Sequence, residues 1–290
     1  MILTYTNQLG KEVVFAAEAG ALKYSPYMLT ELDGAHGLQS QVLSVAQYPQ
    51  DGATYIGSRV EPRDITFQGY ITRDKAKNRI ALLEVMKPKD LGTLTLTRGK
   101  FKRRIDCVVE RAPYFASSRG DLFTCLLFCP QPYWEDANGE IDALMNGWIG
   151  LFEFEVAIDQ EIGVQFGTRT ESYVLDVFNP GDAEAGFEAI FEAVGVVTNP
   201  QILNVTTGQA MKFNVVMASG DVLRVSTAPY SRWALLTHEG GAIVNAMQYI
   251  TPDFVFLRLA PGVNQLRASA DDGGVLLNTN IRFRARYVGV

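Results

Sequence analysis

Residues 61–114 decide the fold, and they read EPRDITFQGYITRDKAKNRIALLEVMKPKDLGTLTLTRGKFKRRIDCVVERAPY. At the start of this stretch Ile65, Phe67 and Ile71 alternate with polar residues, which is the pattern of a strand with one face in a core. The spacing then becomes helical, and after Pro88 it alternates again through a turn at 98–100. The stretch therefore predicts a strand, a helix and a β-hairpin.

The predicted helix covers about residues 74–87, and Thr72 or Asp74 could cap it. A single amphipathic helix between apolar strands must place its stripe against their sheet, because neither apolar surface can stay in water. We therefore expect the stripe in the core of an N-terminal domain. Its members recur at spacings of four and three: Ala76, Ile80, Leu83 and Met86.

Further strand patterns precede this unit. Residues 1–5 and 12–16 flank a turn and predict an opening β-hairpin, and residues 41–48 alternate weakly as another strand. Residues 49–58 have turn chemistry and little periodicity, which predicts a long exposed loop. Long loops in compact domains are usually functional or bound to a partner.

The chain is predicted to be mainly β with two domains. Residues 135–148 are acidic and aperiodic, which predicts a linker between an N-terminal domain over 1–134 and a C-terminal domain over 149–290. Short strand patterns separated by turn signals are typical of an antiparallel β-sandwich in the second domain. The predicted strands cover residues 151–158, 172–178, 187–194, 202–205, 211–217, 222–226, 253–259 and 280–287.

Two of these strands need comment. Residues 187–194 fit a helical stripe and a strand equally well, and we favour a strand because an isolated helix would interrupt a meander. The last strand has the cleanest alternation. Its expected inward side chains are Phe283, Ala285 and Tyr287, and its outward ones are Arg282, Arg284 and Arg286.

Composition indicates an ordinary globular protein. With 290 residues and 47% hydrophobic content the chain can form two ordinary domains, and its apolar runs fall short of the ~20 residues that span a bilayer. The start lacks the pattern of a signal peptide, and three cysteines without framework spacing indicate a reducing cytosol and buried thiols. Cys125 and Cys129 have only two distant histidines available, so no metal site is expected.

Charge is unevenly distributed along the chain. Residues 59–119 hold fifteen Lys or Arg against seven Asp or Glu, whereas the whole chain has a net charge of −6. The basic residues are interleaved along strand and helix faces rather than clustered with aromatic residues. This distribution favours a solvated face or contact with an acidic neighbouring subunit over nucleic-acid recognition.

The sequence points away from catalysis. His36 and His238 are far apart, and neither a phosphate-binding glycine loop nor an HExxH motif is present, so no catalytic residues and no cofactor are expected. A glycosidase-type carboxylate pair stays open among 32 acidic residues. Trp134, Trp148 and Trp233 could form a sugar-stacking platform, but packing in the core and at the domain junction is favoured.

Several stretches resemble one protein family in their order and spacing. They include TNQLGKEVVF (6–15), DGATYIGSRVEPRDITFQGYI (51–71), LLFCPQPYWED (126–136) and IRFRARYVGV (281–290). Together they are similar to the distal tail proteins (Dit) of long-tailed, siphovirus-type bacteriophages and prophages. The resemblance implies a β-barrel-like N-terminal sandwich with one α-helix and a galectin-like C-terminal β-sandwich.

The resemblance also implies a structural, non-enzymatic role. Such a protein forms a homo-hexameric ring that joins the tail tube protein to a tail-tip hub protein of the tail-associated lysin kind, and to receptor-binding or baseplate proteins. DNA passes through its channel without specific binding. The expected location is the virion tail, after assembly in the bacterial cytoplasm and without a membrane. The alternative is a carbohydrate-binding β-sandwich protein for host adhesion, which requires an exposed aromatic cleft on the C-terminal domain.

A ring needs a contact between two different surfaces of each subunit. A basic surface that meets an acidic surface head to tail closes into a cycle when its rotation divides the circle. We expect Asp51, Tyr55 and Arg103 at these subunit contacts. The remaining basic side chains of residues 59–119 are expected at contacts or on outer faces, because a basic channel lining would retain DNA.

Overall fold

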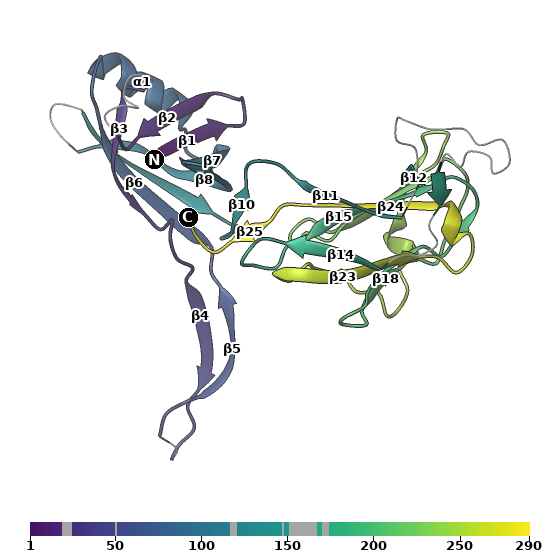
Figure 1. Ribbon diagram of the computed structural model, residues 1–290. Helices are drawn as coiled ribbons and strands as arrows, with labels where there is room; N and C mark the ends of the chain where they lie inside the picture. Colours follow the sequence, from purple (N-terminus) through teal and green to yellow (C-terminus); the bar gives the residue numbers. More distant parts are fainter. Residues whose placement is uncertain (19–24, 50, 117–120, 147, 151–166, 170–173) are drawn as a thin grey trace. The chain divides into compact units, whose positions relative to one another are not determined.

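The computed structural model describes residues 1–18, 25–49, 51–116, 121–146, 148–150, 167–169 and 174–290. The chain divides into two compact units, each with its own hydrophobic core. The first unit contains Met1–Gly139 and Arg286–Val290, and the second contains Glu140–Ala285 (Figure 1). None of the helices among the described residues is long and apolar enough to cross a membrane.

The first unit is built on a sheet that closes on itself. Its strand order is β25-β10-β8-β7-β1-β2-β3-β6-β9, and an additional pairing of β8 with β9 closes a barrel. β2 and β3 pair in parallel, and the other neighbours in this order pair antiparallel. The strands are β1 (Ile2–Asn7), β2 (Glu12–Ala16), β3 (Tyr27–Asp33), β6 (Arg63–Ile71), β7 (Leu91–Arg98), β8 (Phe101–Phe115), β9 (Leu122–Cys129), β10 (Trp134–Asp136) and β25 (Arg286–Tyr287).

The predicted alternation of buried and more exposed residues is confirmed in β6. Ile65, Phe67 and Ile71 of β6 all face the core, between β3 and β9. The predicted hairpin is present as β7 and β8, and Gly99 in its turn has a φ of +61°, which a glycine adopts without steric cost. The opening hairpin of β1 and β2 is also confirmed.

The helix is present, but its predicted buried stripe is wrong except at Met86. α1 (Lys75–Val85) buries Leu82 and Val85, and Met86 follows them into the core. Ile80 and Leu83 are exposed instead. Apolar residues occupy more than one side of the last helical turns, so two phases fit the same spacing and only the position of the barrel decides between them.

The second unit is a two-layer β-sandwich. Its larger sheet has the order β11-β24-β15-β20-β21-β22, its smaller sheet has the order β14-β23-β17-β18, and buried side chains of both sheets form one core. The strands are β11 (Ile141–Asn146), β14 (Val174–Asn179), β15 (Phe187–Ala193), β17 (Gln201–Asn204), β18 (Ala210–Lys212), β20 (Val222–Ser226), β21 (Trp233–Thr237), β22 (Ile243–Asn245), β23 (Gly262–Ser269) and β24 (Leu277–Phe283).

Shorter elements complete the description. Among the described residues of the second unit, two short strand pairs lie outside these sheets and two 3-10 helices are present. They are β12 (Trp148–Gly150) with β13 (Gly167–Arg169), β16 (Val197–Thr198) with β19 (Val216–Met217), and the helices η2 (Ala246–Tyr249) and η3 (Gly274–Leu276). The predicted mainly β fold is therefore confirmed, whereas the expected likeness to galectins stays a prediction.

Several sequence predictions for this half need correction. The predicted linker at 135–148 is wrong, because β10 and β11 both use residues of it for sheet pairing. Residues 253–259 form no strand and instead make isolated backbone bonds. The strand at 187–194 is confirmed as β15, whereas the predicted strand at 151–158 and residues 172–173 lie outside the described residues.

The predicted last strand is in fact two strands. β24 ends at Phe283, and β25 belongs to the barrel of the first unit. Phe283 and Ala285 are buried as predicted, but Tyr287 is only half-buried. Arg282 is exposed and bonded to Asp142. An extended chain keeps its alternation while it passes from one sheet to another, so the pattern cannot show the break.

The corrected helix face gives a direct test of the barrel core. We predict that Leu82→Ala lowers the free energy of unfolding by about 2–5 kcal/mol, because it removes packed methyl groups and leaves a cavity. Leu82 is 0% exposed and its neighbour Leu83 is 36% exposed, so Leu83→Ala is the matched control and should change stability by no more than about 0.5 kcal/mol. Denaturant unfolding measures both, and equal losses would show that the helix face is assigned wrongly.

The cysteines give a second test. Cys107, Cys125 and Cys129 are all buried and free of disulfides, as predicted for the thiols. Burial raises the pKa of the Cys125 thiol, so little reactive thiolate forms there at pH 8. We expect an aromatic disulfide reagent to react slowly with the native protein and rapidly after unfolding in urea. Fast reaction of the native thiols would contradict the closed barrel.

Candidate protein interaction site

A two-stranded ribbon extends away from the barrel (Figure 1). It consists of β4 (Ser40–Val45) and β5 (Thr54–Val60), which pair antiparallel only with each other. Every described residue of these strands except Gly57 is exposed. The ribbon and its tip expose these large apolar side chains: Val42, Leu43, Val45, Tyr48, Tyr55, Ile56 and Val60.

This ribbon has the physical properties of a surface that a partner covers. An isolated pair of strands is marginally stable in water, and both of its outer edges present unpaired backbone donors and acceptors. Leu43 and Ile56 are each 58% exposed, although burying such a side chain stabilises a protein by about 1.5–3 kcal/mol. Contiguous exposed apolar surface of this kind marks interaction sites.

The root of the ribbon is fixed tightly to the barrel. Gly34, just after β3, has a φ of +76°, and a Cβ there would lie 1.9 Å from the backbone oxygen of Asp64. Only glycine fits this turn. The indole Nε1 of Trp134 donates to the carbonyl of Ala35 over 3.1 Å, and Trp134 is fully buried. The segment that leads from β3 into the ribbon is therefore fixed by close packing at Gly34 and by the hydrogen bond from Trp134.

Arg63 holds the root together from inside. Arg63 is the first residue of β6, shortly after β5 ends at Val60, and it is only 4% exposed. Its Nη1 donates to the carbonyl of Gly34 over 2.7 Å, its Nε donates to Pro132 over 2.8 Å, and its Nη2 donates to Val288. Burial lowers the pKa of the Arg63 guanidinium, but arginine stays charged at any physiological pH.

The C-terminal segment passes over the same root. A backbone oxygen of Val290 lies 2.8 Å from His36 Nδ1, and Arg103 donates to the carbonyl of Gly289. The Arg103 guanidinium also stacks over the ring of Tyr287, 3.7 Å from its centroid. Residues 286–290 thus act as a strap across the barrel, and Arg63 and Arg103 bind this strap.

The structure separates the three predicted contact residues. Asp51 and Tyr55 lie on the ribbon and are exposed, and the Tyr55 hydroxyl lies 2.9 Å from Ser58 Oγ. Arg103 lies on β8, and its guanidinium is used within its own chain. Contact of these residues with a second subunit stays a prediction. The predicted loop at 49–58 is partly wrong, because β5 starts at Thr54.

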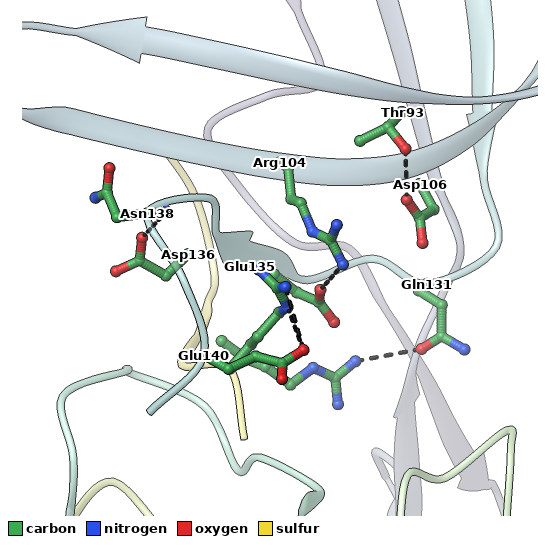
Figure 2. A network of polar contacts seen from close by, with 10 residues as sticks. Thr93, Arg104, Asp106, Gln131, Glu135, Asp136, Asn138 and Glu140 are labelled. Atoms are coloured by element: carbon green, nitrogen blue, oxygen red, sulfur yellow. Dashed lines mark hydrogen bonds and ion pairs between the residues drawn. The ribbon is translucent and has the colours of Figure 1, made fainter. Parts of the chain in front are cut away.

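Basic side chains next to the strap also have partners. Figure 2 shows Arg104 Nη2 on β8 donating to Glu135 over 3.1 Å, with Thr93 bonded to Asp106 on the neighbouring strands. Asp136 accepts a bond from the backbone of Asn138. Part of the basic excess of residues 59–119 is therefore engaged inside the first unit rather than presented as a continuous cationic face.

Sequence reasoning found the first strand of the ribbon, predicted at 41–48 and present as β4, but it missed the second strand and the clamp that Arg63 forms at the root. A ribbon that buries neither face need not alternate apolar and polar residues, so residues 54–58 looked like a loop. Arg63 looked like one of many basic residues. No group of three or more potential metal ligands occurs within the described ranges.

Comparisons with known proteins agree with this architecture. No protein-family model matches the chain, and no curated protein matches it. The crystal structure of the SPP1 Dit (gp 19.1) protein, described as a paradigm of the hub adsorption apparatus in phages that infect Gram-positive hosts, is similar with a TM-score of 0.68. That match covers 98% of each chain at 12% identity.

A second similar structure is a chain of the phage P2 baseplate in its activated conformation. Its TM-score is 0.53 at 12% identity, and the match covers 100% of this chain and 99% of the other. At such identities the likeness concerns the fold. The chain has the fold of a phage Dit or baseplate hub protein along almost its whole length.

The clamp can be tested by removing its charge. We predict that Arg63→Met lowers the free energy of unfolding by several kcal/mol, because each buried carbonyl left unpaired costs about 1–3 kcal/mol. Arg59→Met is the matched control, since Arg59 is exposed and its guanidinium, among the described residues, bonds to the exposed Gln41 side chain. It should change stability by no more than about 0.5 kcal/mol. Urea unfolding compares the two, and a variant at position 63 as stable as the control would disprove the clamp.

Proposed function

We propose that this protein is a structural hub of a phage tail tip, a Dit-type subunit that joins the tail tube to the proteins of the tip or baseplate. The observation that carries the proposal is the fold shared with the SPP1 Dit protein over 98% of both chains. The exposed apolar ribbon supports the proposal, because contiguous exposed apolar surface marks a site that binds a partner.

The proposed assembly is a ring of six copies, the number that the family resemblance supplies. The ribbon of one subunit lies on a different surface of the next subunit, which makes the contact heterologous, and a heterologous contact closes into a ring when its rotation divides the circle. Tyr55 and Asp51 then lie in the contact. The rigid root lowers the entropic cost of binding, because the ribbon is already positioned.

The charge distribution suits this arrangement. The basic excess of residues 59–119 faces acidic surface on neighbouring copies, which aids association and orientation. A channel at the ring centre lets DNA pass without holding it, so its lining is not continuously basic. The pairing of Arg104 with Glu135 and the internal use of Arg63 and Arg103 support this, since they reduce the free cationic surface.

The proposed partners follow from the position in the tail. One face of the ring binds the tail tube protein, and the other binds a tail-tip hub protein and receptor-binding or baseplate proteins. The protein is then a component of the virion tail, assembled in the bacterial host, and its role is mechanical and not catalytic.

A paired substitution tests the ring. We predict that Leu43→Asp with Ile56→Asp converts a multimer into a monomer, because two carboxylates cannot be buried in an apolar contact without a large desolvation cost. The fold should persist, since neither side chain contributes to a core cluster. Light scattering during size exclusion at high concentration, together with electron micrographs, measures the change.

The matched control is Val216→Asp with Ile243→Asp, two exposed apolar residues of the second unit. It should leave the oligomer intact. A wild-type protein that stays monomeric at every concentration would overturn the ring, and a ribbon variant that still forms rings would overturn the role of the ribbon.

A further inference from the structure

The second unit contains an open cleft, which plays no part in the ring contact proposed above. It has a volume of about 590 Å³ and lies beside the turn between β17 and β18, the irregular segment 253–260 and the start of β23. This volume falls in the range of about 300–1,000 Å³ that is usual for small-ligand sites.

Aromatic rings form one wall of the cleft, and they are anchored in the core. Phe254 stands edge-on to the buried Phe213, with ring centroids 5.1 Å apart, and Phe256 stands edge-on to Phe254 at 5.0 Å. Phe254 and Phe256 are both half-buried. The rings are therefore fixed by packing while part of each stays accessible in the cleft.

Two side-chain amide nitrogens in the cleft have no hydrogen-bond partner among the described residues. Asn204 is only 6% exposed, and its Oδ1 accepts bonds from the backbone of Thr206 and Thr207 at 3.0 and 3.1 Å. Its Nδ2 makes no hydrogen bond within the described part of the chain. The side-chain amide of Gln209 is likewise free among these residues. Both amides can donate to a ligand.

The charges of the cleft nearly cancel. Arg258 and Glu184 form an ion pair at 3.2 Å. The guanidinium of Arg232 lies 5.1 Å from the centroid of the Phe256 ring and has no ion pair among the described residues. It holds its planar donors beside the aromatic wall. One cation is too little for a polyanion, and the many polar groups do not suit a purely apolar ligand.

We propose that this cleft binds a hexopyranose unit of an oligosaccharide. A pyranose has an apolar face of C–H groups, which packs against aromatic rings, and a rim of hydroxyls that both donate and accept hydrogen bonds. Phe254 and Phe256 offer the apolar wall, and Asn204, Gln209 and Arg232 offer the donors. This inference does not depend on ring formation.

Ligand-observed saturation-transfer NMR on the whole chain tests the site. The probes are the methyl glycosides of glucose, galactose, mannose, rhamnose, N-acetylglucosamine and N-acetylgalactosamine, in both anomers. We expect transfer to at least one glycoside, and at least a tenfold weaker affinity for Arg232→Ala and for Gln209→Ala. Both residues are exposed, so these variants should melt like the wild type.

The matched control is Arg267→Ala, an exposed arginine of the same unit outside the cleft, and it should bind like the wild type. Absence of transfer to every glycoside overturns the proposal. Transfer that persists at full strength in the Arg232→Ala/Gln209→Ala double variant also overturns it, because the sugar then binds elsewhere.

Discussion

The buried guanidinium of Arg63 is the interaction on which the functional side of the barrel depends. A buried charge is tolerated only when its donors are satisfied, and here the donors reach carbonyls of the ribbon root, of Pro132 before β10 and of Val288 in the strap. These segments are far apart in sequence. The Arg63 side chain therefore links the segment that enters the ribbon, the segment before β10 and the C-terminal strap. The hydrogen bonds of this one side chain offset part of the conformational entropy that is lost when the three segments become ordered.

The root fixes how the ribbon is attached to the barrel. Beyond the root, β4 and β5 pair only with each other, and their large apolar side chains are exposed rather than packed in a core cluster. Its stiff attachment at Gly34, Ala35 and Arg63 makes it a projecting arm with a defined direction relative to the barrel. An arm of this kind binds with less loss of freedom than a flexible loop of the same composition. The sandwich unit has a different character, with a compact core and a polar, aromatic-walled cleft.

The sequence was informative wherever one face of a strand meets a core. Ile65 and Phe67 in β6 were predictable, because burial of one face imposes a period of two on the residues. The turn at Gly99 followed from its residue types, and the strand of Phe187 followed from the strands around it, since its own period fits a helix equally well. Where no such constraint acts, prediction failed. Leu82 rather than Leu83 faces the barrel, since two helical phases fit the pattern. The second strand of the ribbon and the cleft were not predictable, because an exposed strand pair has no buried face, and Arg232 meets Phe256 only through tertiary structure.

The central claim is that neighbouring copies cover the ribbon, and hydrogen exchange of its backbone amides tests this most directly. Amides on the outer edges of β4 and β5 have no internal partner, so in a dilute monomer they should exchange at nearly the rate of an unfolded chain. At concentrations where the protein assembles, the account predicts strong protection of residues 40–60 while the amides of the barrel core stay unchanged. Equal and fast exchange of the ribbon at all concentrations, in a sample that forms rings, would contradict the account.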